Sequence, residues 1–266
     1  MENLSNNQIR ESVMESYKNV ALSNSSCGCD TTSCCSPSET DVLADVSKAM
    51  GYSDSEYKNV PEGSNMGLGC GNPQAIASLK EGEVVLDLGS GGGFDSFLSS
   101  NSVGETGKVI GVDMTPEMVS KARANAEKGG FKNIYFRLGE IEHLPVADST
   151  IDVIISNCVI NLSPEKDKVF SESFRVLKPG GRLAISDIVS SVEIPEDMKK
   201  DLSLYSACVT GASSIDELKI LLDNSGFSEI KIEPKDTSRE FIKDWAPDKG
   251  IENYVISASI EAIKKV

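Results

Sequence analysis

The sequence predicts an α/β fold in which helices cover both faces of a doubly wound, mostly parallel β-sheet. Short runs rich in β-branched residues alternate repeatedly with longer amphipathic stretches. Such alternation is typical of parallel strands joined by right-handed crossovers. The length of 266 residues, with 39% apolar and 25% charged side chains, suffices for one large domain with small additions.

The chain opens with two stretches of different character. Residues 9–22 have weak helical periodicity and predict a short helix. Residues 23–40, SNSSCGCDTTSCCSPSET, hold almost no large apolar side chain, so we expect a mobile, cysteine-rich segment. We therefore divide the chain into an N-terminal segment at 1–40, a core at 41–190, and a final part at 191–266 that covers the substrate and completes the sheet.

Five runs in the core predict its parallel strands, because each is rich in β-branched residues and flanked by turns. They are EVVLDL (83–88), KVIGVD (108–113), NIYFRL (133–138), IDVIIS (151–156) and RLAISD (182–187). Thr115 before Pro116 predicts an N-cap and a first helical residue, and Ser163 before Pro164 repeats the pattern.

The final part predicts a small cap and the last strands of the sheet. Ser214, with Glu217 three residues later, is typical of a capping box at a helix start. Two late runs, 227–234 and 254–263, predict further strands. We expect the last strand to run antiparallel to the others.

Charge and composition narrow the classes of function. A net charge of −15 would repel a phosphate backbone, so we expect no nucleic-acid partner. The sequence has no basic, apolar leader and no apolar run near the length of a membrane span, so we expect a soluble cytoplasmic monomer without a membrane partner. Seven cysteines, an odd number, then indicate free thiols rather than a disulfide framework.

The segment after the first strand indicates a nucleoside ligand. VLDLGSGGGFD places Asp87 before Gly89, Gly91 and Gly93, and the second strand ends at Asp113. In a doubly wound sheet, an acidic side chain at that strand end accepts hydrogen bonds from a ribose diol.

The glycine spacing selects among nucleoside cofactors. The dinucleotide pattern GxGxxG would end on Phe94 if counted from Gly89, where a small residue is needed. The spacing GxGxG after an aspartate instead resembles the first motif of class I S-adenosylmethionine (SAM) methyltransferases. That resemblance implies a Rossmann-like fold with SAM as cofactor, and it adds four cofactor-binding residues: Met114, Glu140, Ile141 and Asn157.

Three cysteines from separate segments are candidates for one pocket. In open α/β sheets the ligand crevice lies outside the carboxyl ends of the strands. Cys158 follows the fourth strand, Cys70 precedes the first strand on a glycine-rich segment able to fold back as a lid, and Cys208 lies in the insertion after the fifth strand. Taken singly, each is also compatible with a small buried hydrophobe, a common role of free cysteine.

The motifs around these cysteines resemble the arsenite SAM methyltransferase family. The matching segments, in order, are LGCGNP, DLGSGGGFD, GVDMTPEMV, LGEIEHLPV, SNCVINLSP, RVLKPGGRLAISDIV and CVTGA. The resemblance implies arsenite as substrate, with Cys70, Cys158 and Cys208 as the arsenic-binding thiols. It also implies that each methyl transfer oxidises arsenic, so an external thiol reductant of the thioredoxin or glutathione type must return electrons. We expect the N-terminal cysteines to assist, Cys34 or Cys35 by disulfide exchange and Cys27 and Cys29 as auxiliary arsenite ligands.

The proposed chemistry agrees with the residue types. Trivalent arsenic is soft, and thiolates suit soft ions. Its lone pair carries no proton, so methyl transfer needs positioning but no general base; the one histidine, His143, is expected at the surface. Two alternatives stay open: a SAM-dependent C- or O-methyltransferase of an organic small molecule, and a thiol-based arsenic-binding module without catalysis.

Overall fold

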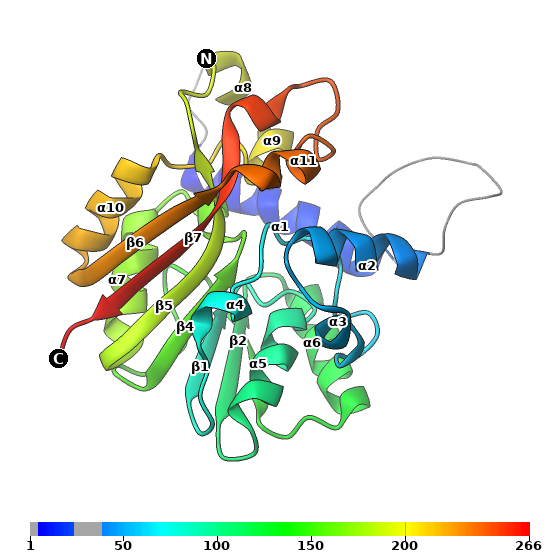
Figure 1. Cartoon of the computed structure of the whole chain (residues 1–266), viewed down its shortest axis with the longest axis vertical. Coiled ribbons are helices and arrows are strands. Elements are labelled where there is room, and N and C mark those ends of the chain that lie inside the picture. Colours follow the sequence, from blue (N-terminus) through cyan, green and yellow to red (C-terminus); the bar gives the residue numbers. More distant parts are fainter. Residues whose placement is uncertain (1–4, 24–38, 200) are drawn as a thin grey trace.

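One mixed sheet organises the molecule (Figure 1). The computed structural model describes residues 5–23, 39–199 and 201–266. Within these ranges the strand order is β3-β2-β1-β4-β5-β7-β6, and β7 alone runs against its neighbours. The strands are β1 Val84–Leu88, β2 Lys108–Asp113, β3 Ile134–Leu138, β4 Ile151–Asn157, β5 Leu177–Ser190, β6 Phe227–Lys235 and β7 Val255–Lys264. The doubly wound, mostly parallel sheet with an antiparallel last strand is confirmed.

Helices cover both faces of the sheet, and each face has its own apolar core. One face carries α4, α5 and α6, with Phe97 fully buried at its centre, and the other carries α7 and α10, with Phe170 fully buried. Removing such large side chains from water is the main stabilising contribution to the fold. The helix bounds are α4 Gln74–Ala77, α5 Phe94–Val103, α6 Pro116–Gly129, α7 Lys166–Val176 and α10 Ile215–Asn224.

The remaining helices lie over the carboxyl ends of the parallel strands and beside α5 (Figure 1). A third apolar cluster joins Val13 of α1 and Leu204 of α9 to the three candidate cysteines, so the cap and the cysteine region pack as one body. The remaining elements are α1 Asn6–Leu22, α2 Glu39–Ala49, α3 Asp54–Lys58, α8 Glu196–Lys199, α9 Leu202–Ser206 and α11 Arg239–Ile242, with 3-10 helices η1 Ile160–Leu162, η2 Asp236–Ser238 and η3 Ile251–Asn253.

Two of the three predicted helix starts are confirmed. Thr115 is the N-cap of α6 with Pro116 at its first position, and Ser214 forms a reciprocal capping box with Glu217 at the start of α10. The helix expected at 9–22 is also present, as α1. The cysteine-rich residues 24–38 lie outside the described residues, so their character and the division at residues 40 and 190 stay predictions.

The helix start predicted at Ser163 is wrong. Helix α7 begins three residues later, at Lys166. The Ser163 hydroxyl instead donates to the Glu142 carboxylate at 2.6 Å and accepts the Glu165 N–H at 3.1 Å. The hydroxyl thus makes both a local and a distant contact, but the N-cap of the helix is Glu165 rather than Ser163.

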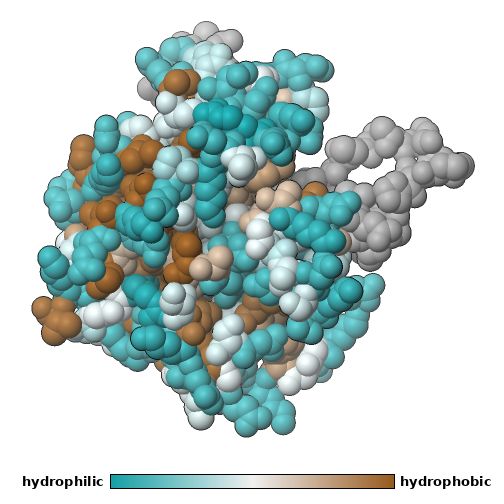
Figure 2. Space-filling model, viewed as in Figure 1, coloured by the Kyte–Doolittle hydropathy of each residue, from teal (hydrophilic) through white to brown (hydrophobic). Residues whose placement is uncertain are grey.

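The surface is largely hydrophilic on the face presented in Figure 2, with hydrophobic side chains gathered around α10 and β6. Ile220 of α10 is one exposed apolar side chain. Over the ranges that the structure describes, no helix combines the length and the apolar character that a membrane crossing requires.

Candidate active site

A partly open cavity lies at the carboxyl ends of β1, β2 and β4, where the strand order reverses. This is the expected ligand position in an open α/β sheet. Its lining includes most of the predicted cofactor residues: Asp87, Gly89, Gly91, Asp113, Met114, Ile141 and Asn157. Gly93 and Glu140 do not line it: Gly93 is the N-cap of α5, and Glu140 lines a second pocket that shares Arg10 and Met114 with this cavity.

The glycine turn after β1 forms one wall of the cavity. Gly89, Gly91 and Gly93 have φ values of +65°, +49° and +96°, a region that favours glycine. A side chain at Gly89 would collide with Val159, in the loop that also carries Cys158. The turn is therefore tightly packed against the cysteine loop and turns its backbone toward the cavity.

Asp113 is held at the end of β2 by the backbone around it. One carboxylate oxygen accepts the Gly91 N–H at 2.9 Å, and the other accepts the Thr115 N–H at 2.8 Å. Burial raises the pKa of Asp113, while these two hydrogen bonds lower it. Each oxygen keeps a lone pair, so the carboxylate has capacity for a diol.

A network of buried hydrogen bonds, which the sequence did not indicate, includes three lining residues of the cavity: Asp87, Asp95 and Asn157. The Tyr52 hydroxyl donates to the Asp95 carboxylate at 2.8 Å, and the Asn157 amide donates to the same group at 3.1 Å. Asp87 accepts the Ser96 hydroxyl at 2.6 Å. Burial raises the pKa of Asp87 well above its usual range, and the charge of Asp95 adds to this rise.

The cavity fits a cationic nucleoside cofactor. Carboxylates line it at Asp87, Asp95 and Asp113, and a ligand carrying positive charge would be attracted to such walls. The buried Ser90 hydroxyl, also in the lining, has no hydrogen-bond partner among the described residues. A buried hydroxyl of this kind requires a partner, and a polar ligand supplies one. The apolar side chains of Met114 and Ile141 flank the side expected to hold the base.

Helix α1 covers the cavity, a contribution the sequence did not reveal. Arg10, Val13 and Tyr17 belong to the cavity lining. The Arg10 guanidinium bonds the Glu142 carboxylate at 3.1 Å and also pairs with Glu165, so α1 is fastened to two separate loops. Charge-assisted hydrogen bonds of this type are stronger than those between neutral groups.

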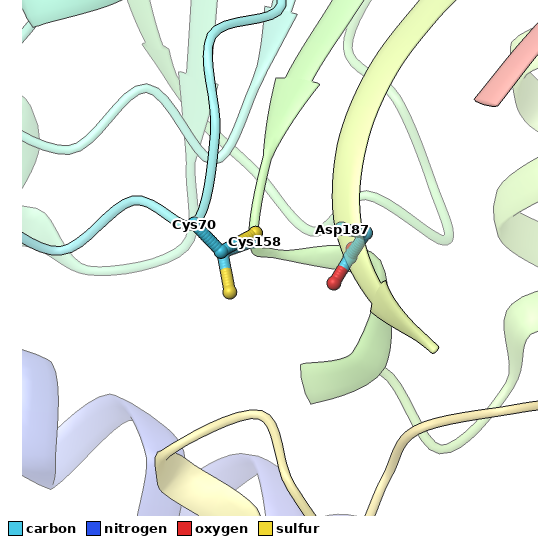
Figure 3. A group of neighbouring side chains, drawn as sticks. All are labelled: Cys70, Cys158 and Asp187. Carbon is cyan, nitrogen blue, oxygen red and sulfur yellow. The ribbon is translucent and has the colours of Figure 1, made fainter. Parts of the chain in front are cut away.

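The three candidate cysteines share one apolar cluster beside this cavity, but only two of them, Cys70 and Cys158, belong to the group whose ligand atoms all lie within 4.8 Å of one another, and Cys208 does not. Cys70, Cys158 and Cys208 are 1%, 3% and 2% exposed and are free thiols. The sulfur atoms of Cys70 and Cys158 lie within 4.8 Å of each other and of a carboxylate oxygen of Asp187 (Figure 3). The Cys208 thiol donates to the Cys158 carbonyl oxygen at 3.1 Å. Cys158 alone lines the cavity, and the other two lie behind it.

Two glycines allow the Cys70 segment to lie against β4. The Asn157 amide oxygen accepts the Cys70 N–H at 3.0 Å, and its nitrogen donates to the Gly71 carbonyl at 2.9 Å. A Cβ atom at Gly69 would lie 2.6 Å from the Asn157 amide, and one at Gly71 would lie 3.0 Å from Ser186. The glycines on either side of Cys70 are thus needed for close approach. Asn157, predicted as a cofactor residue, also anchors the cysteine segment.

Burial and mutual contact keep the thiols protonated. Burial raises the pKa of Cys70, and the charge of Asp187 adds to the rise. The contact with Cys208 lowers the pKa of Cys158, but the contact with Cys70 and burial outweigh it, and the net pKa is well above the usual value. The contact with Cys158, then burial, raises the pKa of Cys208 strongly.

Asp187 is a buried carboxylate that the prediction missed. It lies within β5 at 2% exposure, and its oxygens accept the Ile188 N–H at 2.7 Å, the Ile160 N–H at 2.9 Å and the Asn161 amide at 2.9 Å. A usable signal was present, since Asp187 ends the predicted strand RLAISD as Asp113 ends KVIGVD.

Cys27, Cys29, Cys34 and Cys35 lie outside the described residues, so their roles stay predictions.

Comparison with known proteins identifies the family. A family model described as "Methyltransferase domain" matches residues 79–226. The arsenite methyltransferase of Halobacterium salinarum is 51% identical over 264 residues, which are 97% of this chain and 67% of that protein. The chain belongs to the arsenite methyltransferase family.

Further relatives agree with this family assignment. The arsenite methyltransferase of Aquipseudomonas alcaligenes is 39% identical over 84% of this chain and 63% of its own length. The crystal structure of an arsenic(III) S-adenosylmethionine methyltransferase from Chlamydomonas reinhardtii matches with a TM-score of 0.60 at 32% identity, covering 83% of this chain and 73% of that one. The chain thus spans about two thirds of the length of the Halobacterium salinarum and Aquipseudomonas alcaligenes enzymes.

Proposed function

We propose that this protein transfers the methyl group of SAM to trivalent arsenic held by Cys70, Cys158 and Cys208. One observation carries the proposal: Cys158 lines the cofactor cavity and also contacts both other cysteines. An arsenic atom bound there would lie between the thiols and the cavity. The names of the family's members support arsenite as the substrate.

Arsenite exchanges its three hydroxyls for three sulfurs and releases water. Because the thiols are protonated, each departing hydroxyl takes the proton of the thiol that replaces it. The arsenic lone pair then points away from the sulfurs. When bound, SAM supplies an electrophilic methyl on a sulfonium. The residues of this chain align the lone pair with that methyl and exclude water, and alignment of this kind provides most of the required rate.

The lining residues support SAM binding. We infer that Asp113 binds the ribose diol, that Met114 and Ile141 flank the base, and that the glycine turn accommodates the methionine part. His143 is exposed and does not line the cavity. The histidine is therefore not placed to act as general base toward an organic hydroxyl or amine.

We further propose that the protein works as a monomer in the cytoplasm with an external thiol reductant of the thioredoxin or glutathione type. Each transfer raises arsenic from the trivalent to the pentavalent state, and two electrons must return it. The three described cysteines are free thiols, as expected in a reducing compartment. Cys34 or Cys35 is the proposed exchange thiol.

The deciding experiment is incubation with arsenite, SAM and a thiol reductant, followed by speciation of the arsenic products. We expect methylated arsenic from the native chain and almost none from Cys158→Ser. Ala207→Ser, which adds a hydroxyl beside Cys208 but removes no thiol, is the matched control and should stay active. Full turnover of an organic acceptor by Cys158→Ser would favour the C- or O-methyltransferase alternative. Arsenite binding without any methyl transfer would favour the binding module.

A further inference from the structure

Asp187 brings a carboxylate to the thiol cluster. One of its carboxylate oxygens and the sulfurs of Cys70 and Cys158 all lie within 4.8 Å of one another, close enough to share one bound ion (Figure 3). The three side chains come from the segment before α4, from the end of β4 and from β5. The function proposed above leaves this carboxylate without a role.

The carboxylate is rigidly held and ionised. Three donors fix it: the N–H groups of Ile160 and Ile188 and the Asn161 amide. Burial raises the pKa of Asp187, whereas its three hydrogen bonds and the charge of Lys166 lower it and favour the ionised form. No described cation lies within 4.0 Å of it; the ammonium of Lys166 donates to the Gly211 carbonyl instead, at 2.7 Å. The negative charge is therefore not cancelled by an ion pair.

Burying an unpaired carboxylate is unfavourable, and a positive charge that forms beside it during methyl transfer would interact favourably with it. In that step the arsenic lone pair forms the arsenic–carbon bond, and the carbon–sulfur bond breaks with its electron pair returning to the cofactor sulfur. Arsenic goes from the trivalent to the pentavalent state, and the positive charge passes from sulfur to arsenic. A neutral arsenic complex thus becomes cationic within the buried thiol cluster.

We propose that the Asp187 carboxylate stabilises the positive charge that develops on arsenic and is a further catalytic residue of the reaction. This inference rests on the proposed function. A fixed charge in a water-excluded site acts strongly on a charge formed beside it, and it needs no reorganisation at the moment of reaction. Arsenite binding itself creates no net charge, so Asp187 should contribute to the transfer and little to the binding of the substrate.

The test compares Asp187→Asn and Asp187→Ser with the native chain in two assays. In single-turnover methylation of preloaded arsenic we expect a fall of roughly 100-fold, the size found when one preorganised electrostatic group is removed. The affinity for arsenite without SAM, followed by the fluorescence of Trp245, should change by less than about threefold. Asn161→Ala, which removes one support of the carboxylate but keeps its charge, is the matched control and should lose far less rate than either Asp187 variant.

A second readout does not depend on methylation. Cd²⁺ is a soft dication, and its binding to the thiols can be followed by ultraviolet sulfur-to-metal absorption. Because the carboxylate attracts a cation, Cd²⁺ should bind Asp187→Asn at least about tenfold more weakly, whereas neutral arsenite should not.

Three outcomes would overturn the inference: transfer at the native rate in both Asp187 variants, an equal loss in Asn161→Ala, or parallel losses of arsenite affinity and transfer rate. Absence of methylated arsenic from the native chain would instead refute the proposed function.

Discussion

The Cys208 sulfur lies 3.1 Å from the Cys158 carbonyl oxygen, and both cysteines have backbone φ near +60°. Non-glycine residues rarely adopt this left-handed conformation, and each such residue costs on the order of 1 kcal/mol or more. Two strained cysteines in contact, beside a ligand cavity, indicate that the fold maintains the thiol geometry at some expense in stability.

The number of thiols should matter most for the inorganic substrate. Serine at Cys70, Cys158 or Cys208 should nearly abolish methylation of arsenite. A substrate that already carries one methyl group has one valence fewer for sulfur, so it should tolerate the loss of one thiol better. Rates for both substrates on each variant measure this difference. Equal sensitivity of the two substrates would contradict ligation by three sulfurs.

Asn157 should control arsenite affinity through Cys70. Asn157→Ala removes the acceptor of the Cys70 N–H and the donor to the Gly71 carbonyl. At about 1 kcal/mol for each hydrogen bond, arsenite should bind roughly 30-fold more weakly. Titration calorimetry measures the loss, and a thiol count with an aromatic disulfide reagent checks that all cysteines remain. The exposed Asn253→Ala is the control; if it matched Asn157→Ala, the effect would not be local.

Asp113 should set the affinity for SAM. Asp113→Ala removes the proposed contacts with the ribose. If these are two charge-assisted hydrogen bonds, the binding free energy of SAM should weaken by about 2 to 3 kcal/mol. Calorimetry with SAM gives the value, and thermal melting of the free protein checks that the Gly91 turn survives without its acceptor. Unchanged affinity would exclude Asp113 from the cofactor site.

Arg10 should govern how readily α1 opens. Arg10→Ala breaks the contacts with Glu142 and Glu165, so the amides of α1 should exchange hydrogen faster and SAM should dissociate on the order of tenfold faster. Lys18→Ala removes only an exposed pair with Glu15 on the same helix and serves as control. If both variants release SAM at the native rate, α1 does not limit cofactor exchange.

Arsenite binding should be nearly independent of pH between about pH 7 and 8. The raised pKa values keep the three thiols protonated, and neutral arsenite then exchanges hydroxyls for thiols with no net proton change. Thiolates would behave differently, since each new bond would take up one proton and affinity would fall as pH rises. Calorimetry in buffers of different ionisation enthalpy detects that uptake, and a clear proton uptake would rule out the protonated cluster.

The sequence by itself determined the fold class and most of the strand bounds. The run at 108–113 is β2 without change, and the late strands are displaced by no more than one residue. These features follow from side-chain periodicity and turn residues, which act over a few positions. Cys158 was predicted at the ligand crevice because it follows a strand end, and Cys70 and Cys208 because a lid segment and an insertion were expected to cover the same crevice.

Tertiary structure alone decided which groups surround those cysteines. Arg10 reaches Glu142 across 132 positions, and Asn157 binds Cys70 across 87. The Ser163 hydroxyl likewise bonds a carboxylate 21 residues away, a contact that the Ser-Pro pair does not indicate. Such contacts depend on how completed elements pack, and no local pattern encodes them. The charge of Asp187 beside the thiols became visible only after β4, β5 and the Cys70 segment were brought together.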